Sequence, residues 1–222
     1  ILRYGTYPDV FFSEDKEAAS KLEEIASSYL FKDILSFDKI KKSSIIVKLL
    51  QLLALQVGSE VSYNELASKL GINRITVEKY IDILEQCFIL FRINSFSRNL
   101  RNEISKAIKI YFYDLGIRNS LINHFNPIDL REDVGALWEN FCVIERLKVL
   151  QNQKKMRRVY FWRTHDQKEI DYVEEENGKW FGYEFKWNPE AKVRNTSLFQ
   201  NEYHASVEII HRHNVDTLLL SD

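Results

Sequence analysis

The sequence is poor in residues that cross-link or bend a chain: its 222 residues include 7 glycines, 3 prolines and 2 cysteines. Two cysteines are too few for a disulfide framework, which excludes the small disulfide-stapled folds of secreted proteins. A composition that is 45% hydrophobic and 13% aromatic also excludes disorder and fibrous repeats. We therefore expect a globular chain with one large or two small domains.

The sequence also lacks a long apolar run and an excess of either charge. The longest apolar stretch, residues 45–57, contains Lys48, Gln51 and Gln56 and is too short to span a membrane. Cys87 and Cys142 lie in apolar segments where a buried, reduced thiol is expected. These features predict a cytoplasmic protein with no membrane partner. A formal net charge of -1 means that any nucleic-acid partner must be argued from local patches.

The first half of the chain is patterned as helices followed by a hairpin. Apolar residues recur at helical spacing over residues 16–35 and 44–57. Ser62 and Glu65 form a capping box, and Asn73 can cap a further helix over residues 74–87. Two apolar strands, 88–93 and 108–113, complete the pattern. This order of elements predicts a winged helix.

The second half alternates between helix and strand patterns. A long apolar helix is expected at 135–150, and strands are expected at 159–164, 169–174 and 179–187. The Asn177-Gly178 dipeptide is a strong signal for a two-residue hairpin turn. A helix near 196–203 and a strand at 206–211 end the pattern. The predicted fold class is therefore α+β.

The Asn177-Gly178 turn also predicts a pairing register. Residues whose numbers sum to 355 should face each other, which sets Asp171 opposite Glu184 and Glu169 opposite Lys186 on one face. Two carboxylates in such positions repel each other unless a cation lies between them or one of them is protonated. The register therefore points to a cation site on this hairpin.

The residue types around this pair have the composition of a PD-(D/E)XK nuclease site. Asp171, Glu184 and the helix residue Glu139 are predicted to hold Mg²⁺ or Mn²⁺, because hard cations prefer carboxylate oxygens. The metal would activate water, and Lys186 would orient that water or stabilise the phosphate oxygens. Gly182 is expected to leave room beside the carboxylates. The alternative is a charged strand face whose cross-strand ion pairs catalyse nothing.

Basic residues form two candidate phosphate-binding stretches. The first, around the hairpin, contains Arg92, Arg98, Arg101, Lys106 and Lys109 and faces only Glu103. The second follows the long helix and faces only Asp166 in the sequence, and the helix over 74–87 adds a candidate recognition surface. The residues predicted to bind nucleic acid are Arg74, Arg98, Arg101, Lys154, Lys155, Arg157, Arg158 and Arg163. Such contacts would be independent of base sequence and sensitive to salt.

Several segments resemble one known family over most of the chain. They are the stretches at 4–10 (YGTYPDV), 32–34, 109–119 (KIYFYDLGIRN), 135–140 (GALWEN), 160–164 and 169–173 (EIDYV). Together they look like the C-terminal half of the prokaryotic AAA+-superfamily ATPases that carry an uncharacterised C-terminal domain. In that family a P-loop ATPase precedes a winged helix and a PD-(D/E)XK-like domain.

The resemblance implies a domain plan and a set of partners. Residues 1–40 would be the helical tail of an ATPase lid, 41–122 the winged-helix domain, and 123–222 a restriction-endonuclease-like α/β domain. The chain begins at Ile1 and contains no Gly-x-x-x-x-Gly-Lys-Ser/Thr motif, so it is expected to be a fragment whose missing N-terminal part binds ATP. The ATPase in cis and DNA or RNA are the expected partners, and homo-oligomerisation is left open.

These observations predict the nucleic-acid-binding, nuclease-like region of a AAA+-type ATPase, which cleaves phosphodiester bonds with Mg²⁺. Two alternatives stay open. One is a catalytically inactive nuclease-like domain that regulates the ATPase or recruits partners to it. The other is a scaffold for protein contacts alone.

Overall fold

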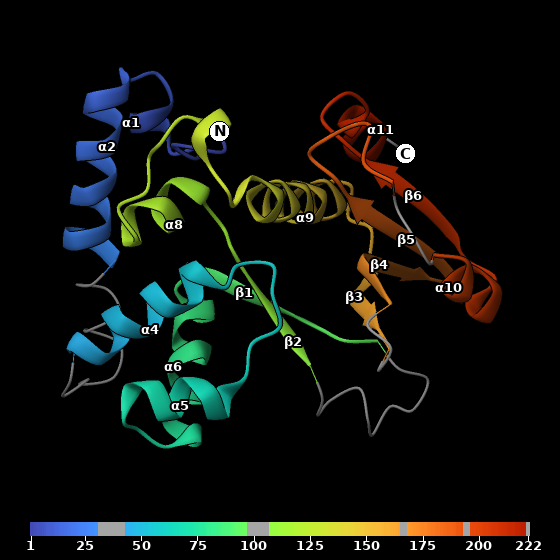
Figure 1. Ribbon diagram of the computed structural model, residues 1–222, viewed down its shortest axis with the longest axis horizontal. Coiled ribbons are helices and arrows are strands. Elements are labelled where there is room, and N and C mark those ends of the chain that lie inside the picture. The colour runs from blue at the N-terminus through green and yellow to red at the C-terminus, as the bar shows by residue number, and fades with distance from the viewer. Residues whose placement is uncertain (31–42, 97–106, 165–167, 193–195, 221–222) are drawn as a thin grey trace. The chain divides into compact units, whose positions relative to one another are not determined.

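The computed structural model describes residues 1–30, 43–96, 107–164, 168–192 and 196–220, and the structural findings below concern these residues. The fold is α+β, as predicted, and the chain forms two compact units (Figure 1). Unit 1 comprises residues 1–92 and 110–132, and unit 2 comprises residues 93–109 and 133–222. The distal part of the first hairpin therefore belongs to unit 2, whereas its base belongs to unit 1.

Unit 1 is mainly helical, and the helices and strands predicted for it are confirmed to within a few residues at their ends. Its elements, with the first hairpin included, are α1 (Pro8–Phe11), α2 (Asp15–Glu24), the π-helix η1 (Ile25–Leu30), α4 (Ser43–Leu55), α5 (Tyr63–Leu70), α6 (Arg74–Gln86), β1 (Leu90–Asn94), β2 (Ile108–Phe112), α8 (Leu115–Leu121) and the 3-10 helix η2 (Ile128–Leu130). The expected helix over 16–35 is confirmed as α2 and η1 within its described part. The short helix α1 was not predicted.

Side-chain caps fix the ends of the central helices. The Ser62 hydroxyl accepts a hydrogen bond from the Glu65 backbone N–H at 3.3 Å, and the Asn73 side chain accepts one from the Thr76 N–H at 2.7 Å. Gly71 ends α5 with a φ of 64°, in the left-handed region that glycine adopts without strain. The caps by Ser62 and Asn73 are confirmed, whereas the Glu65 carboxylate, the other half of the predicted capping box, pairs with Lys69.

Asp114 and Asn119, both in the KIYFYDLGIRN segment, are buried and form hydrogen bonds within unit 1. The Asp114 carboxylate caps α8 at the Ile117 N–H (3.0 Å) and accepts the Thr6 N–H at 2.7 Å. The Asn119 amide donates to the carbonyl oxygens of Leu2 and Arg3 at 2.9 and 2.8 Å. These polar groups satisfy backbone groups of the first six residues, so their role in unit 1 is structural.

Unit 2 is a four-stranded sheet with helices on both faces. Its elements are α9 (Val134–Asn152), β3 (Arg158–Arg163), β4 (Glu169–Glu176), β5 (Lys179–Phe185), α10 (Thr196–Tyr203), β6 (Ser206–Ile210) and α11 (Val215–Leu219). The strand order is β3-β4-β5-β6, with β6 parallel to β5 and the other pairs antiparallel. The predicted helices and strands of this half are confirmed, whereas α11 and the parallel pairing were not predicted.

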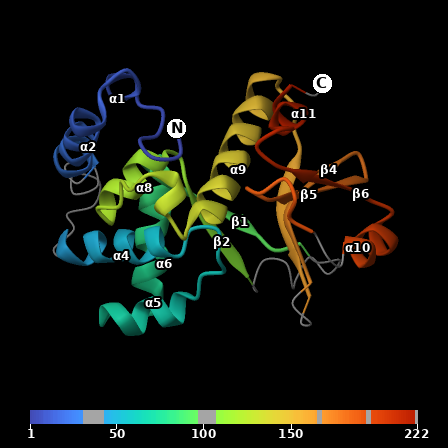
Figure 2. The ribbon, with the colours of Figure 1, turned by 45° about the horizontal axis from the view of Figure 1, so that its top comes forward.

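Neighbouring residues of β5 show that α9 and α10 cover opposite faces of this sheet (Figure 2). A Cβ on Gly182 would lie 3.2 Å from a ring carbon of Phe199, which belongs to α10. The guanidinium of Arg146, on α9, lies 5.9 Å from the ring centroid of Tyr183. Consecutive strand residues point to opposite faces, so the two helices enclose the sheet.

Candidate metal centre

The hairpin of β4 and β5 has the predicted register. The paired residues run from Tyr172 with Tyr183 to Glu176 with Lys179, and every pair sums to 355. Asn177 and Gly178 both have positive φ, at 52° and 78°, as a type I′ turn requires. Asp171 and Glu184 come next along this ladder.

A β-bulge in β4 sets the direction of Asp171. The register of β4 against β3 shifts between the Tyr160–Val173 and Trp162–Ile170 pairs, which gives β4 one extra residue. Ile170 and Val173 are three residues apart yet share one hydrophobic cluster, whereas regular alternation would separate them. The bulge therefore turns Asp171 away from that cluster, as bulges beside functional sites commonly do.

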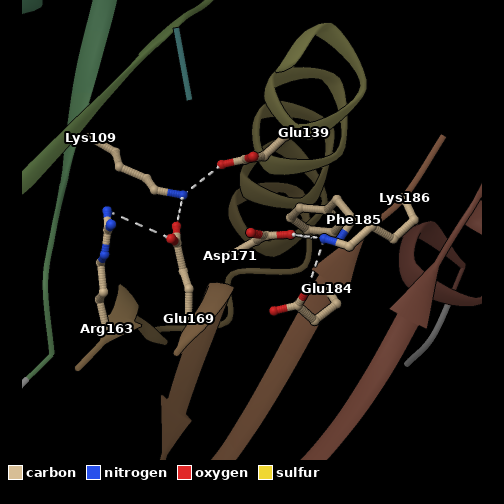
Figure 3. Close-up of polar contacts among 8 residues, drawn as sticks. All are labelled: Lys109, Glu139, Arg163, Glu169, Asp171, Glu184, Phe185 and Lys186. Atoms are coloured by element: carbon tan, nitrogen blue, oxygen red, sulfur yellow. Dashed lines mark hydrogen bonds and ion pairs between the residues drawn. The ribbon is translucent and has the colours of Figure 1, made fainter. Parts of the chain in front are cut away.

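Asp171, Glu184 and Lys186 form one group, called here the Lys186 clamp (Figure 3). The Lys186 Nζ lies 3.1 Å from the Asp171 Oδ2 and 2.8 Å from the Glu184 Oε2. The backbone N–H of Phe185 donates to the same Asp171 oxygen at 2.9 Å, which fixes the carboxylate. The side chain of Lys186 is 31% exposed, and those of Asp171 and Glu184 are 11% and 7% exposed.

Glu139, Glu169 and Lys109 form a second group beside it, called here the Lys109 clamp (Figure 3). The Lys109 Nζ lies 3.0 Å from the Glu139 Oε1 and 2.5 Å from the Glu169 Oε1. Arg163 approaches the other Glu169 oxygen at 3.8 Å. The Lys109 side chain is 3% exposed, and its Nζ lies 5.3 Å from the centroid of the Phe161 ring. The three residues come from α9, β4 and β2.

The second clamp overturns two predictions. Glu169 was expected to lie opposite Lys186, and the two would pair in the alternative of a charged strand face, but the ion-pair partners of Glu169 are Lys109 and Arg163. Lys109 was counted among the phosphate-binding residues of the hairpin, but burial between two carboxylates removes it from that surface. No sequence pattern signals this clamp, because Lys109 and Glu139 are 30 residues apart and in different elements.

Gly182 was expected to leave room beside the carboxylates, but apolar side chains fill the space next to it. A Cβ at this position would lie 3.1 Å from the Val207 Cγ2 and 3.2 Å from the Ile170 Cγ2. Gly182 therefore allows the sheet to pack closely against its core and makes no room for a metal ion.

Burial and charge shift the pKa values of both clamps. Burial, and next the charge of Asp171, raise the pKa of Glu184 to about 7. Burial alone would lower the pKa of each lysine, but the neighbouring carboxylates outweigh it and raise both pKa values. The charge of Asp171 acts on both lysines, so the two clamps share one electrostatic field.

The Cys142 thiol beside the clamps is a packing group. Its side chain is fully buried, and burial together with the charges of Glu139 and Asp171 raises its pKa far above the usual range. It stays protonated at neutral pH and is no nucleophile, in agreement with the sequence-based interpretation. Cys87 is only partly buried, less than predicted.

The donor set of the Lys186 clamp fits a hard cation. Oxygens of Asp171 and Glu184 converge on one ammonium nitrogen, which stands where a positively charged ion would be attracted. The third predicted ligand, Glu139, lies instead in the Lys109 clamp. Within the part of the chain that the structure describes, no three His, Cys, Asp or Glu side chains are grouped ready to hold one metal ion.

Several of the side chains predicted to bind nucleic acid form ion pairs with acidic residues of β4. Arg157 pairs with Glu174 at 2.5 Å and with Glu176 at 2.8 Å, and Arg158 pairs with Glu175 at 2.6 Å. The second basic stretch was expected to face only Asp166, and these pairs show that this was wrong. Arg163 pairs with Glu169, as described above.

Other basic residues differ in what the structure says of them. Arg92, in the first stretch, pairs with Asp82 at 2.7 Å and also with Glu85. Arg74, which begins α6, and Lys154 are exposed, and Lys155 is partly exposed. Arg98, Arg101 and Lys106 lie outside the described residues. Nucleic-acid binding by any of them stays a prediction.

No helix in the described ranges combines the length and the apolar character needed to cross a membrane.

Comparison with known proteins finds two families of domains of unknown function. Residues 1–127 match the domain of unknown function DUF8612, and residues 134–217 match the domain of unknown function DUF4143. The uncharacterized protein Rv2008c of Mycobacterium tuberculosis is 25% identical over 187 residues, which are 83% of this chain and 42% of that protein. An uncharacterized protein of Haemophilus influenzae is 24% identical over 178 residues, 77% of this chain and 41% of that protein.

A third uncharacterized protein is similar over a shorter segment. The uncharacterized protein MJ1637 of Methanocaldococcus jannaschii is 29% identical over 146 residues, 62% of this chain and 31% of that protein. The chain therefore spans less than half the length of the curated relatives it matches. No solved structure matches it.

Proposed function

The chain belongs to the family of the domain of unknown function DUF8612, and from the geometry of unit 2 we propose that it is the nucleic-acid-binding, nuclease-like region of a longer protein. The proposed reaction is the hydrolysis of phosphodiester bonds in DNA or RNA with Mg²⁺ or Mn²⁺. The observation that supports it is the convergence of Asp171 and Glu184 on the Lys186 ammonium group, next to a β-bulge.

The order of elements supports a fold assignment for each part. The run of α4, α5 and α6 followed by the β1–β2 hairpin is that of a winged helix. A long helix, a meander of three antiparallel strands and a further parallel strand are the parts of a restriction-endonuclease-like domain. Under this proposal the acidic and basic side chains meet at the ends of the central strands β4 and β5.

Each residue of the Lys186 clamp then has a chemical role. A bound Mg²⁺ would supply an activated water molecule and offset the charge that builds on the phosphate. Asp171 and Glu184 would hold it, with the Asp171 carboxylate already fixed by the Phe185 N–H. Lys186 is 31% exposed, so its flexible side chain can leave the carboxylates and reach a phosphate oxygen.

The protonation state of the Lys186 amine bears on whether it acts as a general base or as a donor to the phosphate oxygens. Its neighbours Asp171 and Glu184 raise its pKa, so the amine stays protonated at neutral pH. A protonated amine donates hydrogen bonds but cannot remove a proton from water. We therefore propose that Lys186 donates hydrogen bonds to the phosphate oxygens rather than acting as the general base.

The relatives are more than twice as long as the segment they share with this chain. We propose that the remainder holds the P-loop ATPase that the sequence resemblance implies, which would be the site of ATP binding. In that arrangement the nuclease-like region works in cis with the ATPase.

The proposal is tested by incubating labelled double-stranded DNA, single-stranded DNA and RNA with the protein and Mg²⁺ or Mn²⁺. We expect cleavage that EDTA and Asp171→Asn abolish and that Asp216→Asn, a change of an exposed aspartate on α11, retains. Equal cleavage by the wild type and Asp171→Asn would reject the assignment. Salt-sensitive binding without cleavage in any protein would favour the inactive, regulatory domain instead.

A further inference from the structure

The Lys109 clamp has no role in the reaction proposed above, although it is built like the Lys186 clamp. In each clamp one lysine nitrogen lies within hydrogen-bond distance of two carboxylate oxygens, and the two carboxylates belong to different secondary-structure elements. Two neighbouring places that each attract a cation are the arrangement in which a two-ion site would be expected. The question is which of the two ammonium groups an ion can replace.

Burial separates the two lysines. The Lys109 side chain is 3% exposed, against 31% for Lys186. Lys109 also lies over the ring of Phe161, with its Nζ 5.3 Å from the ring centroid. An ion could displace Lys186 into solvent, where its charge is hydrated, whereas displacing Lys109 would leave a buried ammonium group without its carboxylates.

Ser95 and Phe96, which follow β1, are also held by contacts within unit 2. Ser95 forms a parallel bridge with Phe161, and the Phe96 N–H donates to the Phe161 carbonyl at 2.6 Å. The Phe96 ring lies 4.1 Å from that of Trp180, centroid to centroid. Ser95 also donates its N–H to the carbonyl of Ala107 at 2.9 Å, two residues before Lys109. Lys109 is thus supported by backbone pairing and by aromatic packing.

The number of dications that the two clamps can accept depends on the charges of the side chains shown in Figure 3. The carboxylates of Glu139, Glu169, Asp171 and Glu184 face the cations of Lys109, Lys186 and Arg163. With all seven groups charged, these described side chains carry a net charge of minus one. One dication makes the sum plus one, which a phosphodiester neutralises, whereas a second dication would leave an excess of positive charge.

We propose that Lys109 is a positioning residue that takes the place of a second divalent cation, so that the site binds one ion at Asp171 and Glu184 while Glu139 and Glu169 stay bound to Lys109. This inference rests on the proposed function, because it presupposes an ion at the Lys186 clamp. It assigns to a lysine of the hairpin the role that a second metal ion plays in two-ion sites.

The number of bound ions tests this inference without any cleavage assay. Mn²⁺ is titrated into the full chain, the bound ions are counted by isothermal titration calorimetry, and electron paramagnetic resonance reports spin coupling between ions a few ångströms apart. We expect one ion per chain and no coupling in the wild type. Two coupled ions in the wild type would overturn the inference while leaving the proposed function intact.

Substitutions of Lys109 give the second readout. We expect Lys109→Met to bind two coupled Mn²⁺ ions, because Glu139 and Glu169 lose the cation that they share, and Lys109→Arg to bind one, because it keeps the positive charge. One ion in Lys109→Met would overturn the inference. If Lys109→Met does not fold without metal, recovery of its thermal transition by Mn²⁺ but not by equal ionic strength of NaCl supports it, and no recovery counts against it.

Failure of the proposed function would look different. Absence of any Mn²⁺ binding in the wild type, or identical binding in the wild type and Asp171→Asn, would reject the ion site itself. Binding that Asp171→Asn abolishes, with a wrong count of ions, would reject only the role of Lys109.

Discussion

Two lysines of unit 2 each bridge a pair of carboxylates, but the Lys109 side chain is 3% exposed whereas the Lys186 side chain is 31% exposed. The same contact therefore has two different consequences. Lys109 is 3% exposed, so water has little access to its ammonium group and its ion pairs are expected to stabilise the fold. Around Lys186, at 31% exposure, water and ions compete with the lysine, so the contact can exchange. The exposure of the lysine, rather than the geometry of its contacts, distinguishes the clamp that we propose to be structural from the clamp that we propose to bind an ion.

A third ion-pair group supports this distinction. Glu174 is fully buried and pairs with Arg146 at 2.8 Å and with Arg157 at 2.5 Å. Arg146 also donates to the carbonyl of Leu218 at 2.7 Å, which attaches α11 to α9. This group resembles the Lys109 clamp in burial and holds helices and sheet together.

The largest expected difference between the clamps is in activity. Lys186→Met should lower kcat/KM for cleavage by roughly 10²–10³-fold, the usual effect of losing one charged group that stabilises a transition state. Lys179→Met, an exposed lysine on the same strand, should leave cleavage unchanged. Steady-state kinetics on a short oligonucleotide measures both, and equal values for the two variants would remove Lys186 from the site.

The difference reverses when stability is measured. Without divalent ions, Lys109→Met should lower the free energy of unfolding by about 1–3 kcal/mol, because it removes the buried lysine that two partly exposed carboxylates share. Lys148→Met, which removes a lysine that is 41% exposed in a pair with Glu145, should cost less than about 1 kcal/mol. Urea unfolding in EDTA measures both variants. Similar decreases in the free energy of unfolding would contradict a stabilising role for the buried Lys109.

The Lys186 clamp should also make the free energy of unfolding depend on pH. The folded-state pKa of Glu184 is about 7, above its value of about 4.3 in an unfolded chain. Between these values the folded protein holds a proton that the unfolded chain has lost, so the free energy of unfolding falls as pH rises through this window.

Ion binding should show the opposite trend with pH, because it requires the Glu184 carboxylate. The affinity for Mn²⁺ should rise by up to about tenfold per pH unit below pH 7 and level off above it. Calorimetric titrations at several pH values measure this, with Glu184→Gln as the control that should lose the dependence. A flat profile in the wild type would exclude Glu184 as the titrating ligand.

The smallest expected effects lie in unit 1, outside both clamps. Asn73→Ala removes the cap of α6 and should lower the free energy of unfolding by about 1 kcal/mol. It should leave the Mn²⁺ affinity of unit 2 unchanged. Urea unfolding and calorimetry on the same variant check both statements, and a changed Mn²⁺ affinity would show that the site depends on this helix.

The features that sequence predicted well are local ones. Ser62 and Asn73 cap helices because their side chains reach backbone groups three residues away. The Asn177-Gly178 turn fixed the register because only a few residue pairs adopt positive φ at both turn positions. From that turn the proximity of Asp171 and Glu184 follows by counting.

The features that sequence missed depend on contacts between distant segments. The bulge at Asp171 arises from the match of β4 to β3, which the β4–β5 turn does not determine. Lys109 and Arg157 were interpreted as phosphate contacts because their carboxylate partners lie on other elements. Glu139 was predicted to be the third metal ligand, but its partner in the structure is Lys109, which the sequence did not indicate.

The central claim is that a divalent ion replaces Lys186, and not Lys109, between its carboxylates. Nuclear magnetic resonance of the lysine side-chain ammonium groups tests this directly, with assignments from Lys109→Arg and Lys186→Arg and with Asp171→Asn as the control without a site. Addition of Mg²⁺ should shift or broaden the Lys186 signal in the wild type, leave that of Lys109 in place, and change neither in Asp171→Asn. A displaced Lys109 signal, or no change at Lys186, would contradict the account.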